Sequence, residues 1–428
     1  MPSRIALLLS SAAAAAVDSA ALTPAAPAFG HAMLAEFSFE PLYVNLNHGS
    51  YGSAPRSVTA AAAAWTAACE ANPDAWFRFP DRLWPAYEAL RQRLARAIGS
   101  GANDTVMVEN ASQGVNAVLR SLARSAPPAP RNKLLLLSTA YFMVKETAQY
   151  LSPGLSPLLV NVSLPMTDAA LLAAVGAALA AHAGEVYAAS FSHIVSVPGV
   201  LLPVKALTAL CHAHGVLVLI DGAHALGQVP VDVADIGAEF WLGNAHKWLY
   251  GAKGSALLWV APHAQALIEP TTISWEGRGA THFLLAFSYV GTTSYSNYLA
   301  MGAALDFRER VGGDAAIIAY MHDLAVRGGA LLARAWATDV LHGEAQYAAM
   351  VDVRVPVSNA TVAGGLGAAL MARYHTFVPI YDIGGVGGTP GVYYARVSAQ
   401  IFNELGDFQY LADAVTTLLA EEALLNGG

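Results

Sequence analysis

The chain has 428 residues, which is long enough to bury a large core and to form two domains. Hydrophobic residues make up 55% of it and charged residues only 13%, which excludes a largely disordered chain. The net charge of −8 provides no basic surface, so we expect no nucleic-acid partner, and two cysteines are too few for a disulfide framework.

Residues 1–34 differ in composition from the rest of the chain. An apolar, alanine-rich stretch at 5–17 has the length of a signal-peptide hydrophobic region, and small residues and prolines follow it up to residue 27. We interpret 1–34 as a targeting leader, secretory or organellar, with a disordered Ala/Pro tail as the alternative. The stretch is too short to span a bilayer, so no stable membrane insertion is expected.

Helical and strand patterns then alternate along most of the chain. Apolar spacing predicts helices at 83–98, 115–124, 169–183 and 207–214. Short apolar runs predict strands at 105–109, 134–138, 186–191, 216–220, 240–242 and 256–260. This alternation predicts an α/β large domain over residues 35–300, with a mostly parallel sheet covered by helices on both faces.

The pattern changes after about residue 300. Long helical runs are predicted at 299–311 and 316–336, followed by shorter strands and a last helix at 408–425. The glycine-rich segment 384–388 leads into a strand at 392–397, so it is interpreted as a flexible turn and not as a phosphate loop. We therefore predict a smaller α+β domain over residues 301–428.

Asp221 and Lys247 are the most informative residues. The apolar run 215–220 predicts a buried strand that leads into Asp221, so this carboxylate stands where open α/β sheets bind ligands. Lys247 lies between His246 and Trp248, whose rings could desolvate its amine and lower its pKa. Such a pair indicates pyridoxal phosphate (PLP), bonded to the lysine, with the aspartate holding the pyridine nitrogen protonated. The alternative is a turn-capping aspartate and a surface lysine.

The lysine count favours Lys247 as the cofactor lysine. The chain has only four others. Lys133 opens a strand, Lys145 and Lys205 lie on helical stretches, and Lys253 lies in a glycine-flanked turn. None of the four has aromatic neighbours in sequence that would desolvate its amine.

The segment NASQG at 110–114 lies between a predicted strand and a predicted helix. Free N–H groups and the helix dipole favour an anion there, and Ser112 adds a hydroxyl donor, so the segment predicts a phosphate site. The alternative is that Ser112 only caps the helix. Residues 110–112 also form a glycosylation sequon, and a glycan there would block this site. This argues against secretion and favours a cytoplasmic or organellar location.

The segment Cys211-His212-Ala213-His214 could be interpreted as a set of metal ligands. Its place between a predicted helix and the strand before Asp221 favours a helix C-terminus, which suits cationic histidine. We therefore predict no metal site.

Six motifs then occur in order along the chain: LNHGSYG at 46–52, NASQGVN at 110–116, DGAH at 221–224, GNAHKW at 243–248, GT at 291–292 and RVSAQ at 396–400. Together they resemble the class V aminotransferase superfamily. The branch is that of isopenicillin N epimerase-like proteins, ergothioneine-pathway C–S lyases and cysteine desulfhydrase-like enzymes. The resemblance runs from about residue 35 to the C-terminus.

This resemblance implies the PLP fold type I, in a homodimer with its active sites at the subunit interface. Lys247 is then the cofactor lysine, Asp221 pairs with the pyridine nitrogen, and Arg396 binds the α-carboxylate of an amino-acid substrate. Asn47 and His48 border the substrate. The remaining residues implied around the cofactor are His224 at its phenolic oxygen, Ser112, Gln113, Asn244 and His246 at its phosphate, Thr292 of the partner subunit, Tyr141 on its ring, and His193 and Ser196.

Three of these implied positions differ from the family pattern or have another interpretation. Relatives often carry a histidine two positions before the stacking aromatic, where this chain has Thr139. His193 could equally be a packed structural residue, and Arg396 could form a structural ion pair.

The motifs fit three reactions at the substrate Cα or Cβ: β-elimination of a sulfur group, transamination and epimerisation. We favour a C–S lyase, because elimination needs only Lys247, Asp221 and a good leaving group, whereas epimerisation needs a second base. Persulfide-forming desulfuration is disfavoured because neither Cys69 nor Cys211 lies on a predicted mobile loop. A non-catalytic PLP-fold protein is the alternative of another class.

Overall fold

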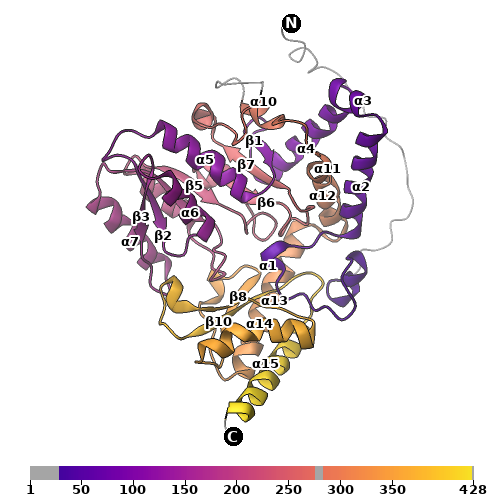
Figure 1. Ribbon diagram of the computed structural model, residues 1–428, viewed down its shortest axis with the longest axis vertical. Helices are drawn as coiled ribbons and strands as arrows, with labels where there is room; N and C mark the ends of the chain where they lie inside the picture. The colour runs from indigo at the N-terminus through magenta and orange to yellow at the C-terminus, as the bar shows by residue number, and fades with distance from the viewer. Residues whose placement is uncertain (1–27, 275–282, 427–428) are drawn as a thin grey trace.

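A computed structural model describes residues 28–274 and 283–426 of the chain. It shows a large α/β domain and a smaller domain that carries the C-terminus (Figure 1). The PLP fold type I architecture predicted from the sequence is confirmed in its two sheets, one mostly parallel and one small.

The large domain is built on a seven-stranded sheet with the order β1-β7-β6-β5-β4-β2-β3. Its strands are β1 (Thr105–Val108), β2 (Lys133–Leu137), β3 (Ser156–Val160), β4 (Val186–Ser192), β5 (Leu217–Asp221), β6 (Phe240–Asn244) and β7 (Ala256–Val260). From β3 to β6 all neighbours pair in parallel, and β7 is antiparallel to both β6 and β1. The carboxyl ends of β1 to β6 therefore meet at one edge.

Helices cover this sheet because parallel strands are buried on both faces. Those of the large domain are α2 (Arg56–Ala71), α3 (Pro73–Arg78), α4 (Leu83–Ala97), α5 (Ala111–Ser125), α6 (Phe142–Leu151), α7 (Asp168–Ala181), α8 (Val204–His212), α9 (Val233–Ile236), α10 (Phe283–Ser288), α11 (Ser296–Leu299) and α12 (Met301–Arg310). Helix α5 packs on β5, β6 and β7 beside α6, whereas α7 and α8 pack together against β3, β4 and β5.

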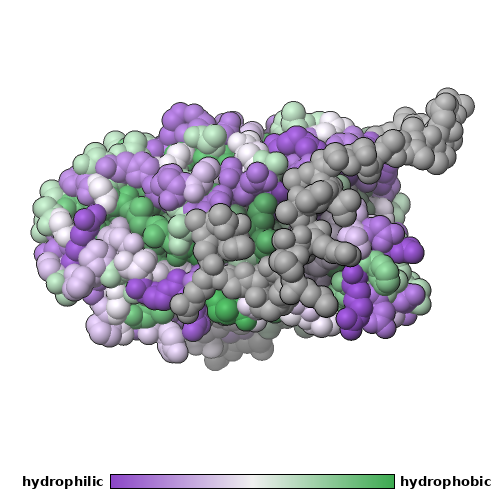
Figure 2. Space-filling view, turned by 90° about the horizontal axis from the view of Figure 1, so that it is seen from above, coloured by the Kyte–Doolittle hydropathy of each residue, from purple (hydrophilic) through white to green (hydrophobic). Residues whose placement is uncertain are grey.

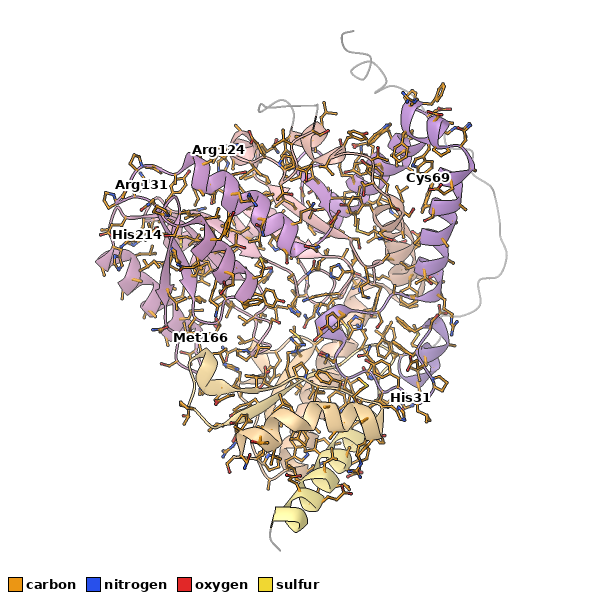
Figure 3. The ribbon with its side chains drawn as sticks, viewed as in Figure 1. His31, Cys69, Arg124, Arg131, Met166 and His214 are labelled. Carbon is orange, nitrogen blue, oxygen red and sulfur yellow. The ribbon has the colours of Figure 1, made fainter. Side chains whose placement is uncertain are left out.

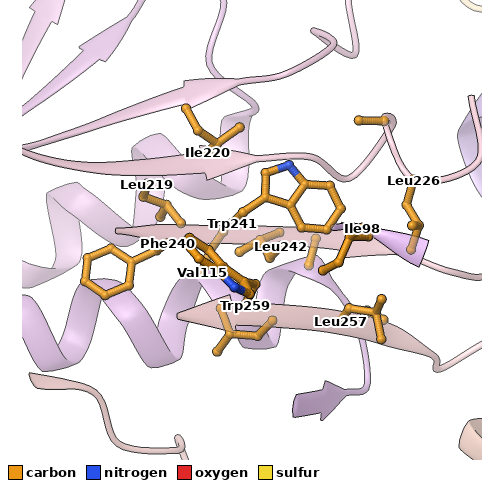
Figure 4. Close-up of a cluster of buried hydrophobic side chains, with 14 of the residues drawn as sticks. Ile98, Val115, Leu219, Ile220, Leu226, Phe240, Trp241, Leu242, Leu257 and Trp259 are labelled. Atoms are coloured by element: carbon orange, nitrogen blue, oxygen red, sulfur yellow. The ribbon is translucent and has the colours of Figure 1, made fainter. Parts of the chain in front are cut away.

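The centre of the large core lies around Trp241 of β6 (Figure 4). Its indole is fully buried among side chains of β5, β6 and β7, among them Leu219, Leu242 and Leu257. Gly222, directly after Asp221, makes room for this ring, because a Cβ there would lie 2.5 Å from the indole. Each large apolar side chain buried here contributes about 1.5–3 kcal/mol, so the strand ends are held rigidly.

The small domain has an antiparallel sheet of order β8-β10-β9, made of β8 (Met350–Arg354), β9 (Ile380–Asp382) and β10 (Tyr393–Ser398). Helices α13 (Gly313–Ala335), α14 (Ala360–Tyr374) and α15 (Leu405–Asn426) complete its layers. A 3-10 turn, η5 (Ile383–Val386), stands before β10, so the glycine-rich segment forms a turn as predicted.

Helix α13 contributes to both hydrophobic cores. Met301, Phe307 and Met321 belong to the core of the large domain, whereas Leu324, Leu331 and Leu332 belong to the core of the small domain. The division at residue 301 stays a prediction. Leu46 also packs in the small-domain core, far from it in sequence.

The first described residues contact both domains. Residues 1–27, which hold most of the predicted leader, lie outside the described residues. In the 3-10 helix η1 (His31–Glu36), Met33 is buried in the core of the large domain, and His31 is hydrogen bonded to Asp407 of the small domain at 2.9 Å (Figure 3). The N–H of Gly30 donates to the carbonyl of Ile401.

Several elements depart from the sequence prediction. Helix α5 begins at Ala111, so the predicted turn at 110–114 is its first turn. The helix predicted at 299–311 is α12, and α11 ends at the first residue of that predicted range. Helices α2 and α6 and strands β8 and β9 were predicted without bounds, and α14 and β3 were not predicted, because alanine-rich or short mixed segments carry weak periodicity.

Helix α13 is the one helix of the described part that is long and apolar enough, by length and composition alone, to cross a membrane. Here it packs against α15 and β8 as a core helix of the small domain. The surface at the far end of the large domain mixes polar residues with smaller apolar areas (Figure 2).

Candidate active site

The predicted chemical residues meet at the carboxyl edge of the large sheet. Asp221 ends β5, Asn244 ends β6, His193 directly follows β4, and α5 starts two residues after β1. Lys247 lies in the turn after β6, facing the same edge. The parallel pairing of β4, β5 and β6 brings together residues that are more than 50 positions apart in the sequence.

The amine of Lys247 is buried and close to a histidine. Its Nζ lies 2.9 Å from Nε2 of His224. The pKa of Lys247 is lowered to about 7, mainly by burial and also by the positive charge of Arg396, while the negative charge of Asp221 acts in the opposite direction. A large fraction of this amine is therefore neutral, and nucleophilic, near pH 7.

Asp221 is a buried carboxyl group with one local hydrogen bond. It accepts the N–H of Ala223 at 3.0 Å. Burial raises its pKa, against the smaller effects of that hydrogen bond and of Lys247. In the described part of the chain no cation lies within ion-pair distance of it, so Asp221 is free to pair with a cationic ligand.

The start of α5 provides free hydrogen-bond donors. Asn110 caps this helix by accepting the N–H of Gln113 at 2.9 Å, and Asn244 accepts the N–H of Ala111 at 2.8 Å. The side chain of Gln113 accepts the N–H of Glu109. Ser112 is therefore not the cap: within the described chain its N–H and its hydroxyl have no partner. The unpaired N–H and hydroxyl of Ser112 indicate an anion site, because a helix N-terminus favours negative charge.

Arg396 is buried where the two domains meet. It lies on β10, and its two terminal nitrogens donate to Ser196 of the large domain and to the first residues of α1 (His48–Tyr51) with its cap. The Nη1 group donates to the carbonyl of Ser196 at 2.7 Å and to its hydroxyl at 3.2 Å. The Nη2 group donates to Asn47 at 2.9 Å and Ser50 at 2.8 Å, while the buried Nε has no partner. Among the described residues Arg396 forms no ion pair, contrary to the structural alternative.

The comparisons with known proteins agree with this geometry. A family model described as "Aminotransferase class-V" matches residues 47–362. The chain belongs to the class-V aminotransferase family. This is a family of PLP enzymes.

Three relatives cover nearly the whole chain. A "Putative L-cysteine desulfhydrase 2" of Oryza sativa is 31% identical over 90% of this chain and 87% of its own. The "Isopenicillin N epimerase" of Streptomyces clavuligerus is 30% identical, over 89% and 96%. The "Hercynylcysteine sulfoxide lyase" of Schizosaccharomyces pombe is 25% identical, over 90% and 97%.

Two solved structures share the fold. A cysteine desulfurase of Thermococcus onnurineus has a TM-score of 0.75 at 18% identity, and the match covers 94% of this chain and 100% of that one. A variant of C-DES with glycine covalently linked to its PLP cofactor has a TM-score of 0.71 at 20% identity, and covers 90% and 97%.

His48 and Lys253 both form hydrogen bonds next to the lysine turn. His48 is buried, its Nε2–H donates to the carbonyl of Lys247 at 2.9 Å, and burial lowers its pKa to about 3. It supports the lysine turn, and its contact with a substrate stays a prediction. Lys253 is also partly desolvated, which lowers its pKa, but its amine donates to the carbonyl of Gly52.

The remaining predicted residues are placed as follows. His246 is half-buried, its Nδ1 lies 3.1 Å from the carbonyl of Ser255, and burial lowers its pKa to about 4. His193 is buried with Nδ1 unpaired, and burial lowers its pKa to about 4. Tyr141 is 46% exposed at the start of α6, so its ring is free to stack. Thr292 is exposed before α11, and its contact from a partner subunit stays a prediction.

Sequence reasoning missed a buried pair beside Arg396. Asp352 of β8 is the direct cross-strand neighbour of Arg396, and it accepts the hydroxyl of Tyr381 at 2.9 Å and the N–H of Gly199 at 2.7 Å. Burial raises the pKa of Asp352 to about 6. A single acidic residue within the apolar stretch 349–353 was the available signal.

Gly52 shows how tightly the lysine turn is packed. Its φ of +68° suits glycine, and a Cβ there would lie 1.9 Å from the carbonyl oxygen of His246. Gly52→Ala should lower the free energy of unfolding by more than about 3 kcal/mol, the sum of backbone strain and this overlap. The control is Gly237→Ala, with a φ of +74° and open space, which should lose only about 1–2 kcal/mol. If urea titrations gave the same loss of unfolding free energy for both variants, the overlap between the new Cβ and the His246 carbonyl would have no measurable effect on stability.

The electrostatics of Lys247 predict opposite effects of two substitutions. In protein freed of cofactor, amine modification at Lys247 should follow pH with a midpoint near 7. Asp221→Asn removes a negative charge and should lower the midpoint, whereas Arg396→Met removes a positive charge and should raise it. Peptide mapping after timed acylation measures both, with the exposed Lys205 as internal reference. Shifts of the same sign would contradict the arrangement of charges.

Proposed function

We propose that this class-V enzyme uses PLP, held at Lys247, to cleave a C–S bond in a cysteine-derived amino acid. The observation behind the proposal is the desolvated amine of Lys247, whose pKa of about 7 leaves a large fraction of it neutral near pH 7, close to the buried Asp221 and Arg396. Aminotransferase and epimerase activity are the alternatives within the family, and a PLP-fold binding protein without activity is the alternative outside it.

The residues present fit the cofactor. Ser112 offers an unpaired N–H and hydroxyl at a helix N-terminus for a phosphate, and Asn244 fixes the first turn of that helix. Asp221 offers an unpaired carboxylate for a protonated ring nitrogen. The buried hydroxyl of Thr139, at the end of β2, has no partner within the described chain and faces the same edge of the sheet. Gln113, His246, His224, Ser196 and Tyr141 are further proposed to surround the group.

When bound, PLP supplies an electron sink for the electron pair left at the substrate Cα. Lys247 takes the Cα proton at Nζ, since its lowered pKa leaves much of the amine unprotonated at neutral pH. Asp221 holds the proton at the cofactor ring nitrogen. Arg396 orients the substrate by its carboxylate, and Asn47 already contacts that guanidinium at 2.9 Å.

Cleavage of the Cβ–S bond then releases the sulfur group, which takes up a proton and leaves as a thiol or a related sulfur product. With cysteine as substrate and water added, the products are hydrogen sulfide, pyruvate and ammonia. The names of the desulfhydrase and sulfoxide lyase relatives support this reaction. Because the chain is 30% identical to an isopenicillin N epimerase, epimerisation is the second candidate reaction.

The cysteines support elimination over persulfide-forming desulfuration. Cys211 is buried in α8, and burial raises its pKa to about 12. Cys69 lies on the outer helix α2 (Figure 3), and burial also raises its pKa. A thiol must ionise and reach the substrate to accept sulfur, and neither side chain meets both conditions.

We also propose a homodimer in which Thr292 of the partner subunit reaches the phosphate. Its exposure in the segment before α11 is consistent with this role.

The reaction is tested by product analysis. The purified enzyme, loaded with PLP, is incubated with L-cysteine, S-substituted cysteines, cysteine sulfoxides and a panel of other L-amino acids. We expect pyruvate, ammonia and a sulfur product from at least one cysteine derivative, and none from Lys247→Ala. Formation of the D-isomer, or of pyridoxamine phosphate and an oxo acid, would instead assign epimerisation or transamination.

The cofactor lysine is tested separately, by borohydride reduction of the loaded enzyme and peptide mapping. We expect the pyridoxyl label on Lys247 and on no other lysine. A label on Lys253, the other partly desolvated amine, would overturn the assignment of the cofactor site.

Arg396 should set substrate affinity more than cofactor binding. Arg396→Lys keeps the charge but removes the planar fork, so it should raise KM at least about tenfold, a loss of about 1.4 kcal/mol. The visible absorbance of the bound cofactor should remain. An unchanged KM would mean that the carboxylate binds elsewhere.

A further inference from the structure

His224 uses both of its ring nitrogens inside the protein. Nε2 lies 2.9 Å from Nζ of Lys247, and Nδ1 lies 3.4 Å from Nε1 of Trp248, whose N–H points at it. The imidazole is 3% exposed and the indole is fully buried. The histidine therefore stands between a residue that can only donate a hydrogen bond and an amine that can donate or accept one.

The chemistry of the indole decides where the proton of His224 lies. An indole N–H cannot accept a hydrogen bond, so Nδ1 must be the unprotonated acceptor. Burial, together with the charges of Lys247 and Arg396, holds the pKa of His224 well below its usual range, so the ring is neutral. A neutral imidazole has one proton, which is then on Nε2 and faces the lone pair of the Lys247 amine.

We propose that Trp248 is a positioning residue that fixes the proton of His224 on Nε2, and that this N–H donates to the unprotonated amine of Lys247. The inference rests on the proposed role of Lys247 as the cofactor lysine. The residue next to the lysine thereby controls the protonation state of that lysine through a histidine 23 positions earlier in the chain.

The opposite tautomer would have the opposite effect. A bare Nε2 would accept a hydrogen bond from a lysine ammonium and so favour the charged form, which is not nucleophilic. The charged or titratable groups that act on Lys247 and His224 are Asp221, Arg396 and His246. None of them donates a hydrogen bond to Nδ1 of His224 within the described chain, so the N–H of Trp248 is the only partner of that nitrogen there.

The indole is held in the position that this role requires. The carbonyl of Trp248 accepts the Nη1–H of the buried Arg308 at 2.8 Å, and the ring of His48 packs against the indole at 5.1 Å. Gly49 also packs on it, since a Cβ at that glycine would lie 3.2 Å from the indole. A rotation of the indole away from His224 would disrupt this packing.

The test replaces the N–H without changing the shape of the side chain. Trp248 is exchanged for 3-benzothienylalanine, which has sulfur in place of the indole N–H, and Trp248→Phe serves as a second variant. The matched control is the same exchange at Trp241, an equally buried indole whose N–H has no partner in the described chain. Two quantities are measured in cofactor-free protein: the ¹⁵N shifts of His224, assigned with His224→Gln, and the pH midpoint of Lys247 acylation.

We expect His224 to carry its proton on Nε2 in the wild-type protein and to lose this preference when the Trp248 N–H is removed. The pH midpoint of Lys247 should then rise by roughly one unit, because the histidine can now accept from the ammonium. Reaction at pH 7 should become about fivefold slower. The exchange at Trp241 should leave both quantities unchanged.

Three results would overturn the proposal: a proton on Nδ1 of His224 in the wild-type protein, an unchanged midpoint in both Trp248 variants, or an equal shift on exchange of Trp241. Failure of the proposed function gives a different result, because the borohydride label would then lie on a lysine other than Lys247.

Discussion

The site depends on one physical constraint, the removal of the Lys247 amine from water. Lowering the pKa of a lysine from 10.5 to about 7 corresponds to roughly 5 kcal/mol against the charged form, which the fold must sustain. Three residues pack around the lysine turn. His48 is hydrogen bonded to the carbonyl of Lys247, Gly52 lies against the carbonyl of His246, and Trp248 is hydrogen bonded to His224. The same burial that keeps the amine neutral also makes it nucleophilic, so stability of the turn and reactivity of the amine have one cause.

The second consequence of this burial is a cluster of groups with compensating charges. Arg396 disfavours the charged form of Lys247, whereas Asp221 favours it, and Asp352 favours the charged form of Arg396. Burial raises the pKa of both carboxyl groups, and a cationic neighbour acts in the opposite direction because it favours the ionised carboxylate. A ligand that brings a phosphate, a pyridinium and a carboxylate would complete the pairing of these charges, which is why the arrangement suits PLP and an amino acid.

The substrate end of the site is formed by both domains. Arg396 and Asp352 belong to the small domain, yet they hold Ser196 and Gly199 of the large domain by hydrogen bonds. Residues 46–52 add a third component, since Leu46 packs in the small domain while Gly52 packs on the lysine turn. A relative movement of the domains would therefore change the position and the hydrogen bonds of the Arg396 guanidinium, which is proposed to bind the substrate. The choice among elimination, transamination and epimerisation depends on this end of the site more than on the lysine and aspartate, which all three reactions share.

The sequence by itself determined the parts of the protein that depend on local pattern and residue chemistry. The strand before Asp221, the helices around it, the family, and the choice of Asp221 and Lys247 as the central residues followed from apolar runs and from residues at their ends. Only the tertiary structure decided contacts between distant segments. Examples are Leu46 in the small-domain core and His48 as a support of the lysine turn. The buried pair of Asp352 and Tyr381 and the hydrogen bond from Trp248 to His224 belong to the same group. The physical reason is that periodicity reports which side of an element is buried, whereas the partner of a buried polar group depends on how elements far apart in the chain are packed together.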